Sequence, residues 1–255
     1  MIPPLPAAFL QAPIAHRALH DVSNNRPENS RAAIRAAIDA GYGIEIDLQL
    51  TADDRAVVFH DYDMARLTGQ SGPIRQVSAF AASNTTLLYG KDGIPTLDDV
   101  LEIVAGQVPL LIELKDQDGA MGVNIGALEN DTVRALQGYE GPVALMSFNP
   151  NSVAELARLA PHLPRGITTC AYEPSVELLP QDVCDHLRDI PDFDRVGAGF
   201  ISHEAADLSR ARVVELKAQG VPILCWTVRT PEQEAEARMV ADNVTFEGYL
   251  AAHSA

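Results

Sequence analysis

Two acidic side chains interrupt an apolar stretch of this chain. Glu45 and Asp47 stand two positions apart in the run GIEIDL, and residues two apart on a β-strand point to the same face of the sheet. Two buried carboxylates so close together repel each other, and a bound divalent cation removes that repulsion. The alternative for such a pair is that one carboxylate lies at a solvated edge of the sheet.

A third acid favours a metal site. Glu113 and Lys115 share one face near the end of the apolar run PLLIELK, which is typical of a parallel strand. Together, Glu45, Asp47 and Glu113 form the kind of oxygen-rich ligand set that Mg²⁺ or Ca²⁺ prefers. The sequence therefore predicts one divalent cation, Mg²⁺ or Ca²⁺, on these three acids, with Lys115 placed to contact a phosphate oxygen. The alternative is a Glu113–Lys115 ion pair at the end of a strand.

Two histidines also end apolar runs. His16 follows the run PIA, and His60 follows the run VVF. A pair of imidazoles can divide proton transfer at a phosphodiester, because one removes a proton from the nucleophile while the other protonates the departing alkoxide. We therefore expect His16 and His60 to be catalytic, without knowing which one is the acid. A single histidine at the end of a strand more often packs or caps.

Further residues are candidates for contact with a substrate. Arg17 follows His16, and Glu28 precedes a predicted helix, where it either orients Arg17 or is an exposed acid at the helix start. Phe148 and Trp226 end later apolar runs. Aromatic side chains at the rim of a barrel form pocket walls, although a lone aromatic residue is more often part of the core.

The elements that position these residues alternate along the chain. Short apolar runs lie between longer segments of helical periodicity, which is the pattern of parallel strands joined by helices. The predicted strands cover residues 13–16, 43–50, 56–60, 109–115, 143–148, 166–170, 197–202, 221–228 and 243–246. The predicted helices cover residues 29–40, 97–105, 128–137, 151–159, 209–219 and 231–240, with Asn29 or Ser30, Thr96 and Ser209 as N-caps.

Nine strands are one more than an eight-stranded barrel uses. Too few residues separate the second and third strands for a parallel crossover, whereas the intervening Ala52-Asp53-Asp54-Arg55 suits a hairpin. A turn centred on Asp53 and Asp54 places His60 across from Asp47, within a residue of register. The predicted fold is a (β/α)₈ barrel of TIM type, which commonly has about 250 residues, with an antiparallel hairpin following the second strand and one domain over residues 1–255.

Composition excludes several functional classes. The formal net charge of −16 argues against binding nucleic acid or an anionic membrane, because both require clustered Lys and Arg. The three cysteines lie in no close-spaced ligand pattern, which predicts reduced, structural thiols. The chain begins without the basic region of a signal peptide and has no apolar run of about 20 residues. We therefore expect a cytoplasmic protein without a stable membrane anchor.

In their order and spacing, these motifs resemble the glycerophosphodiester phosphodiesterase family. The matching residues are His16-Arg17, Pro27-Glu28-Asn29-Ser30, Glu45-Ile46-Asp47, Val57-Val58-Phe59-His60-Asp61, Ile94-Pro95-Thr96-Leu97, Glu113-Leu114-Lys115, Ser147-Phe148 and Trp226-Thr227-Val228. The resemblance implies a barrel related to that of phosphoinositide phospholipases C. It also implies that the three acids bind the metal, that the two histidines are the acid/base pair and that Arg17 and Lys115 contact phosphate. The implied partner is a small glycerophosphodiester, and the implied products are glycerol 3-phosphate and an alcohol.

Two departures from the family pattern bear on the pocket. Ala18 stands where the family usually has Gly, and the segment ADNVTFEGY replaces the usual GVDGIITDxP near the C-terminus. Two other functions fit the motifs: a phospholipase D-like activity on lysophospholipids or sphingolipids, and a catalytically silent protein that binds phosphodiesters. The motifs do not distinguish attack by water from a cyclic phosphate intermediate, and they leave the alcohol and the oligomeric state open.

Overall fold

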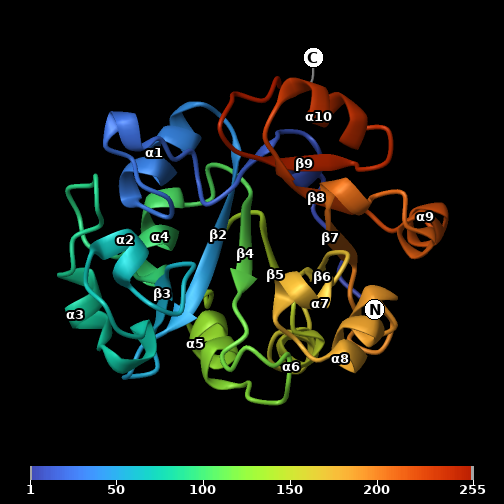
Figure 1. Ribbon diagram of the computed structural model, residues 1–255. Coiled ribbons are helices and arrows are strands. Elements are labelled where there is room, and N and C mark those ends of the chain that lie inside the picture. The colour runs from blue at the N-terminus through green and yellow to red at the C-terminus, as the bar shows by residue number, and fades with distance from the viewer. Residues whose placement is uncertain (1, 254–255) are drawn as a thin grey trace.

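A closed ring of parallel strands forms the centre of the computed structural model, which describes residues 2–253 apart from the side chain of Glu177. The strands pair in the order β1, β9, β8, β7, β6, β5, β4 and β2, and β1 also pairs with β2, which closes the ring (Figure 1). The ring consists of β1 (Ile14–Ala15), β2 (Gly43–Leu50), β4 (Leu110–Leu114), β5 (Val143–Ser147), β6 (Arg165–Thr169), β7 (Phe200–Glu204), β8 (Ile223–Val228) and β9 (Asn243–Phe246). The predicted TIM-type barrel is confirmed.

Helices lie outside the ring of strands (Figure 1). They are α1 (Arg31–Asp39), α2 (Ala65–Thr68), α3 (Ala79–Ser83), α4 (Leu97–Val104), α5 (Ala127–Ala135), α6 (Pro150–Leu159), α7 (Pro174–Glu177), α8 (Gln181–Arg188), α9 (Ala211–Ala218) and α10 (Pro231–Ala237). Short 3₁₀ turns occupy η1 (Ala7–Leu10), η2 (Val22–Asn24), η3 (Ile74–Gln76) and η4 (Ala205–Asp207). None of the helices within residues 2–253 is long and apolar enough to cross a membrane.

Six of the helices had been predicted, whereas α2, α3, α7 and α8 had not. The short helices α2, α3 and α7 contain too few residues to show a helical period, and α8 begins after Pro180 without a side-chain cap. Caps explain where the predicted helices begin. The Ser30 side chain accepts from the backbone N–H of Ala33, and Thr96 forms a capping box with Asp99.

Several predicted boundaries differ from those of the structure, and two of these differences concern α9 and β7. Helix α9 begins after Arg210, which occupies the N-cap position, so Ser209 lies outside the helix. Strand β7 begins at Phe200, later than residue 197, because Gly197 has a φ of +61°, which is a left-handed and not an extended conformation. Strand β7 also ends later than predicted, at Glu204, and therefore includes His203.

The hairpin after β2 is antiparallel as predicted, but its register differs by one residue. Strand β3 (Ala56–Val58) pairs Leu50 with Ala56, and the backbone N–H of Phe59 donates to Asp47 O. The residue facing Asp47 is therefore Phe59, one position from His60, so the predicted pairing is confirmed within its tolerance of one residue. The turn has three residues between paired Thr51 and Arg55, the last being Asp54 in a left-handed conformation, and an odd turn length shifts the pairing by one.

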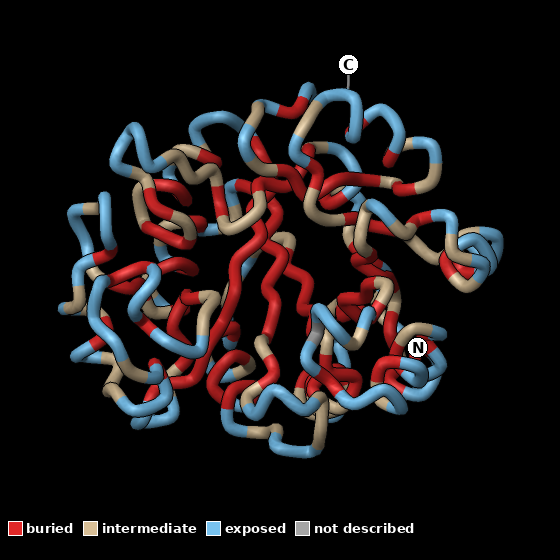
Figure 2. The backbone as a smooth tube through the Cα atoms, in the orientation of Figure 1, coloured by how far each residue is buried: buried red, intermediate tan, exposed pale blue. Residues whose placement is uncertain are grey.

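Alternation along the strands produces two apolar cores, and buried residues follow the ring of strands in Figure 2. Outward-facing side chains such as Ile44 and Val244 pack beneath the helices. Inward-facing side chains near the N-terminal ends of the strands, including Leu111 and Phe200, pack against Phe9 of η1. This inner cluster fills the N-terminal end of the barrel and leaves the C-terminal end, where barrel active sites lie, to polar residues.

Candidate active site

Strands β2 and β4 carry the three acids predicted to bind a metal. Glu45 and Asp47 alternate with apolar residues whose side chains pack outward in the larger core. Asp47 pairs across the sheet with Glu113, so the three acids point to one side of the sheet, into the barrel. Their ligand oxygens lie within 4.8 Å of one another, and the residues are 2%, 1% and 5% exposed. This cluster can hold a metal ion.

The three carboxylates differ in their charge environment. Lys115 Nζ lies 2.8 Å from Asp47 Oδ1 and 2.6 Å from Glu113 Oε1. Burial acts to raise the pKa of Asp47, but the charges of Lys115 and of His60 outweigh burial and hold that pKa well below its usual value. Glu45 has no ion pair with a described residue, and burial together with the charges of Asp47 and Glu113 raises its pKa well above the usual value. Among the described residues, Glu45 is therefore the carboxylate of the three without a direct cationic partner.

The loop after β1 brings Arg17 to the acids. Its backbone N–H donates to Glu45 Oε2 at 2.8 Å, its Nη1 donates to Glu28 Oε1 at 2.8 Å, and its Nε lies 3.5 Å from Asp47 Oδ2. Arg17 and Ala18 have φ angles of +51° and +64°. A side chain in this left-handed region costs about 1–2 kcal/mol, whereas glycine adopts it freely. Ala18 is therefore a strained replacement of the family's glycine.

His16 directly follows β1 and contacts a carboxylate from the far end of the chain. Its Nδ1 lies 2.6 Å from Oε2 of Glu247, which follows β9, and Arg229 Nη2 lies 2.7 Å from the other carboxylate oxygen. An ionised carboxylate only accepts hydrogen bonds, so it favours a proton on Nδ1 and leaves Nε2 as the acceptor. Burial lowers the pKa of His16, although Glu247 acts to raise it. The imidazole is therefore poised to accept a proton.

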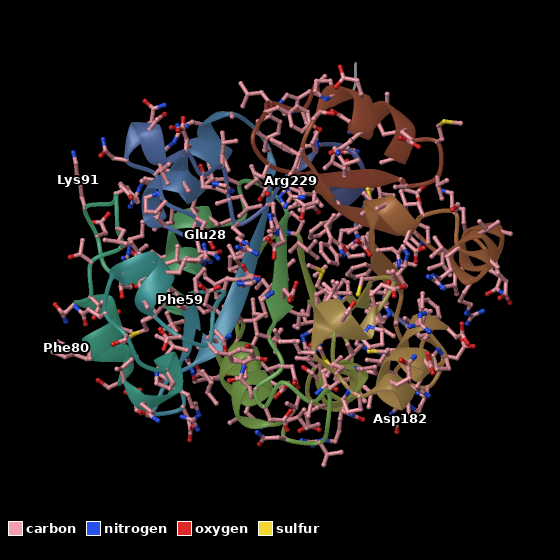
Figure 3. The ribbon with its side chains drawn as sticks, in the orientation of Figure 1. Glu28, Phe59, Phe80, Lys91, Asp182 and Arg229 are labelled. Carbon is pink, nitrogen blue, oxygen red and sulfur yellow. The ribbon has the colours of Figure 1, made fainter. Side chains whose placement is uncertain are left out.

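His60 is held in a similar way. Its Nδ1 lies 2.8 Å from Asp61 Oδ1, and Arg66 Nε donates to Asp61 Oδ2 at 2.6 Å. Arg66 also donates to both oxygens of Glu28, which in turn accepts from Arg17. Figure 3 shows Glu28 near the middle of the molecule. A continuous series of ion pairs thus connects the second histidine to the phosphate-contacting arginine predicted from the sequence.

Phe148 and Trp226 form a wall of the cavity at this end of the barrel. Their ring centroids are 5.4 Å apart at an interplanar angle of 81°. The cavity has a volume of about 210 Å³, and eight of the ten predicted site residues line it, all except Asp47 and Glu28. These two acids contact lining residues. A second cavity of about 600 Å³ shares His60, Glu113, Lys115 and Phe148 with the first.

Two contacts of the site are not predicted from the sequence. Asn29, one of two residues expected to cap α1, donates from Nδ2 to Asp47 Oδ2 at 2.9 Å instead. The position of Asn29 directly before a helix is also typical of a cap, so the sequence gave no reason to prefer a contact with Asp47. Glu247 lies in the segment that departs from the family pattern. Glu247 is an ionisable residue directly after the last strand, just as His16 is directly after the first. The same signal could therefore have identified Glu247 from the sequence.

Barrel fold and site together define a TIM-barrel enzyme with its polar site at the C-terminal ends of the strands. Comparison with protein-family models identifies the family to which this enzyme belongs. Residues 16–245 match the model of the glycerophosphoryl diester phosphodiesterase family, and the chain belongs to this family of phosphoric diester hydrolases. Glu247 lies just beyond the matched region.

Two curated relatives match part of the chain. An uncharacterized protein of Bacillus subtilis, YqiK, is 35% identical over 165 residues, covering 61% of this chain. A glycerophosphodiester phosphodiesterase of Caldanaerobacter subterraneus is 32% identical over 163 residues, covering 60% of this chain. The match covers 65% of the length of each relative, which is less than two thirds.

A solved structure supports the fold. A phosphodiesterase of Oleispira antarctica, in complex with the product sn-glycerol-3-phosphate, superimposes with a TM-score of 0.73 and 23% sequence identity. The superposition covers 94% of both chains. At this level of identity, the similarity establishes the shared barrel.

Proposed function

We propose that this protein hydrolyses glycerophosphodiesters to glycerol 3-phosphate and an alcohol, with one divalent cation, Mg²⁺ or Ca²⁺, and with His16 and His60 as the acid/base pair. The observation that carries the proposal is the gathering of three buried carboxylates within 4.8 Å in a cavity lined by both histidines. Family membership and the glycerol phosphate bound by the Oleispira protein support the substrate class.

The acid cluster fits a hard divalent cation. Glu45, Asp47 and Glu113 offer only oxygen ligands, which Mg²⁺ and Ca²⁺ prefer over the nitrogen and sulfur ligands of softer metals. Lys115 supplies one positive charge to Asp47 and Glu113, and Glu45 has no such partner among the described residues. When bound, the cation would polarise a non-bridging phosphoryl oxygen.

Two cations of the chain complete the phosphate site. Arg17 is oriented by Glu28, and Lys115 is held between Asp47 and Glu113. Both residues line the cavity. Positive groups that are fixed before the substrate arrives stabilise the charge of the transition state without having to reorganise. Arg17 and Lys115 therefore neutralise phosphoryl oxygens in the proposed mechanism.

The surroundings of the histidines suggest how they divide the work. Burial lowers the pKa of His16, so its imidazole is neutral near pH 7 and Nε2 takes the proton of the nucleophile. His60 borders both cavities, and the larger one has room for the departing alcohol. As the new P–O bond forms and the P–O bond to the alcohol breaks, His60 gives its proton to the departing oxygen. Water and the neighbouring glycerol hydroxyl are both compatible as nucleophiles.

A substrate panel tests the proposal. Glycerophosphocholine, glycerophosphoethanolamine, glycerophosphoglycerol and lysophosphatidylcholine would each be assayed with Mg²⁺, Ca²⁺ or EDTA. We expect release of glycerol 3-phosphate from the first three with metal, and none in EDTA. Glu113→Gln should be inactive, whereas Glu155→Gln, which alters a surface ion pair with Arg158 on α6, should keep full activity.

Other outcomes of the panel would overturn the proposal. Hydrolysis of lysophosphatidylcholine alone would indicate the phospholipase D-like activity, and binding without turnover would indicate a silent phosphodiester-binding protein. Full turnover in EDTA would contradict the metal requirement. The cytoplasmic location expected from the sequence stays a prediction, which fractionation of cells against a cytoplasmic marker tests.

A further inference from the structure

Three buried hydroxyl groups, on β6, β7 and β9, face the inside of the barrel that also holds the acid cluster. Ser202, Thr245 and Thr168 are each at most 1% exposed, and their side-chain oxygens have no hydrogen-bond partner among the described residues. Ser202 pairs with Leu224 and Thr245 pairs with Ile14, and both partners belong to the inner apolar cluster. Paired residues of parallel strands point to the same face, so these hydroxyls point inward.

Two of these hydroxyl-bearing residues border the catalytic cavity. Ser202 and Thr245 line it together with His16 and Trp226, whereas Thr168 does not. Buried polar groups are normally hydrogen-bonded, so two unpartnered hydroxyls on residues that line a cavity indicate a ligand or water that completes them. Strand β7, which carries Ser202, lies across the ring from β2, whereas β9, which carries Thr245, is separated from β2 only by β1 (Figure 1).

The size and walls of the cavity indicate what the ligand group is. A volume of about 210 Å³ is below the range of about 300–1,000 Å³ that holds drug-sized ligands, so this part of the site admits a small group and not an acyl chain. The indole Nε1 of Trp226 donates to Ser202 O at 3.1 Å, which fixes the ring as an apolar wall. A short polyol suits such a space, because its CH₂ groups pack on the ring and its hydroxyls find partners.

We propose that Ser202 and Thr245 bind the terminal hydroxyl of the glyceryl group, the hydroxyl farthest from phosphorus, and thereby select glycerol-linked diesters. This inference rests on the proposed function, since it takes the phosphate to lie beside the acids. The glyceryl group then extends across the barrel toward β7 and β9. Each side-chain hydroxyl can donate or accept, so the pair matches a substrate hydroxyl in either role. Thr245 lies in the segment that departs from the family pattern.

The test removes one hydroxyl from the protein and one from the substrate. Thr245→Val keeps the side-chain shape and Ser202→Ala is a second variant. We expect either change to lower kcat/KM for glycerophosphocholine by about 3- to 10-fold, the equivalent of about 0.6–1.4 kcal/mol for one neutral hydrogen bond. The corresponding phosphocholine diester of propane-1,2-diol lacks the terminal hydroxyl, and its kcat/KM should change by less than about twofold. The wild-type protein should prefer the glyceryl substrate.

Thr168→Val is the matched control, because it removes a third unpartnered hydroxyl from the same interior outside the cavity. We expect it to leave both substrates unaffected. Calorimetric affinity for glycerol 3-phosphate and propane-1,2-diol 1-phosphate gives a second readout that does not depend on turnover. Melting temperatures verify folding, and they should not fall in the valine variants because an unsatisfied group is removed.

Two results would overturn the inference: an equal loss on both substrates, or an effect of Thr168→Val as large as that of Thr245→Val. Either would show that these hydroxyls serve packing or bind structural water. Unchanged kcat/KM in both cavity variants would overturn it as well. A wild-type protein without metal-dependent turnover would instead contradict the proposed function, so the two failures are distinguishable.

Discussion

Replacing Glu247 by glutamine tests whether His16 is the catalytic base. The Glu247 carboxylate lies 2.6 Å from His16 Nδ1 and 2.7 Å from Arg229 Nη2. The His16 and Glu247 side chains are only 13% and 19% exposed, so solvent screens their interaction weakly. Glu247→Gln keeps the length of the side chain and removes its charge. Figure 3 shows Arg229 near the middle of the molecule, whereas Asp182 lies at its edge.

The size of the effect follows from the hydrogen bond that is weakened. Hydrogen bonds to charged groups contribute about 1.5–3 kcal/mol and neutral ones about 0.5–1.5 kcal/mol. The substitution should therefore cost the protonated imidazole about 1.4 kcal/mol, which is about one pKa unit. Glu247 acts to raise the pKa of His16, so its replacement lowers that pKa further below the usual value. A base must be unprotonated, so the acidic limb of the kcat/KM profile should move down by about one pH unit.

Glutamine should also lower the plateau of activity. The carboxylate favours the tautomer with the proton on Nδ1, whereas an amide can present either its oxygen or its NH₂ group to the ring. Part of the population would then carry the proton on Nε2, where the base must accept. We expect kcat to fall by about 10²- to 10⁴-fold, the range that positioned acid–base groups contribute.

The assay is the kcat/KM profile for glycerophosphocholine with saturating Mg²⁺, for the wild type, Glu247→Gln and Arg229→Gln. Arg229→Gln should shift the acidic limb slightly upward, because Glu247 then loses its second positive partner. Glu155→Gln on α6 is the control and should reproduce the wild-type profile. A shift of the alkaline limb would show that His16 is the acid. No shift, with kcat within threefold of the control, would refute the role of Glu247.

Three further predictions concern the metal, the acid and stability. Glu45→Gln should abolish metal-dependent turnover. It should also raise the melting temperature in EDTA, because burial and neighbouring charges already disfavour the ionised carboxylate. Full turnover after exhaustive dialysis against EDTA would contradict the metal requirement. His60→Ala should slow glycerophosphocholine hydrolysis by about 10²- to 10⁴-fold. It should slow hydrolysis of a p-nitrophenyl diester far less, because p-nitrophenolate departs without a proton. His16→Ala should slow the hydrolysis of both substrates alike. Burial lowers the pKa of His203, although the charge of Asp207 acts to raise it. As the pH falls, His203 of the unfolded chain therefore takes up a proton before His203 of the folded chain, and the free energy of unfolding decreases below about pH 6.5. His203→Gln should lessen the fall in melting temperature between about pH 7.5 and pH 5.5, and equal slopes would disprove this.

Local rules were sufficient wherever the determining interactions lie within one element. The two-residue spacing of Glu45 and Asp47 put both on one face of a strand before any partner was known, because side chains alternate on every strand. Thr96 marked the start of α4 for a similar reason, since its cap bonds only the first turn. These features depend on backbone geometry within a few residues and are visible in the sequence.

The register of the hairpin depended on a backbone conformation that the sequence does not reveal. Turn composition predicted an antiparallel pair correctly, but the register depended on the left-handed conformation of Asp54, which lengthens the turn to three residues. Composition did not indicate which residue would adopt it. A shift of one position exchanged His60 for Phe59 opposite Asp47. His60 nonetheless lines the cavity, because its position depends on the loop that follows the strand.

Contacts between the two ends of the chain were decided by the closure of the barrel. Strand β1 pairs with β2 on one side and β9 on the other, and this brings Glu247 to His16 although 231 positions separate them. The same closed ring places Ser202 and Thr245 in one cavity with Glu45 and Glu113. The sequence by itself determined which side chains point into the barrel. Only the tertiary structure decided which of them meet, because the pairing of distant strands depends on the whole ring and not on any one segment.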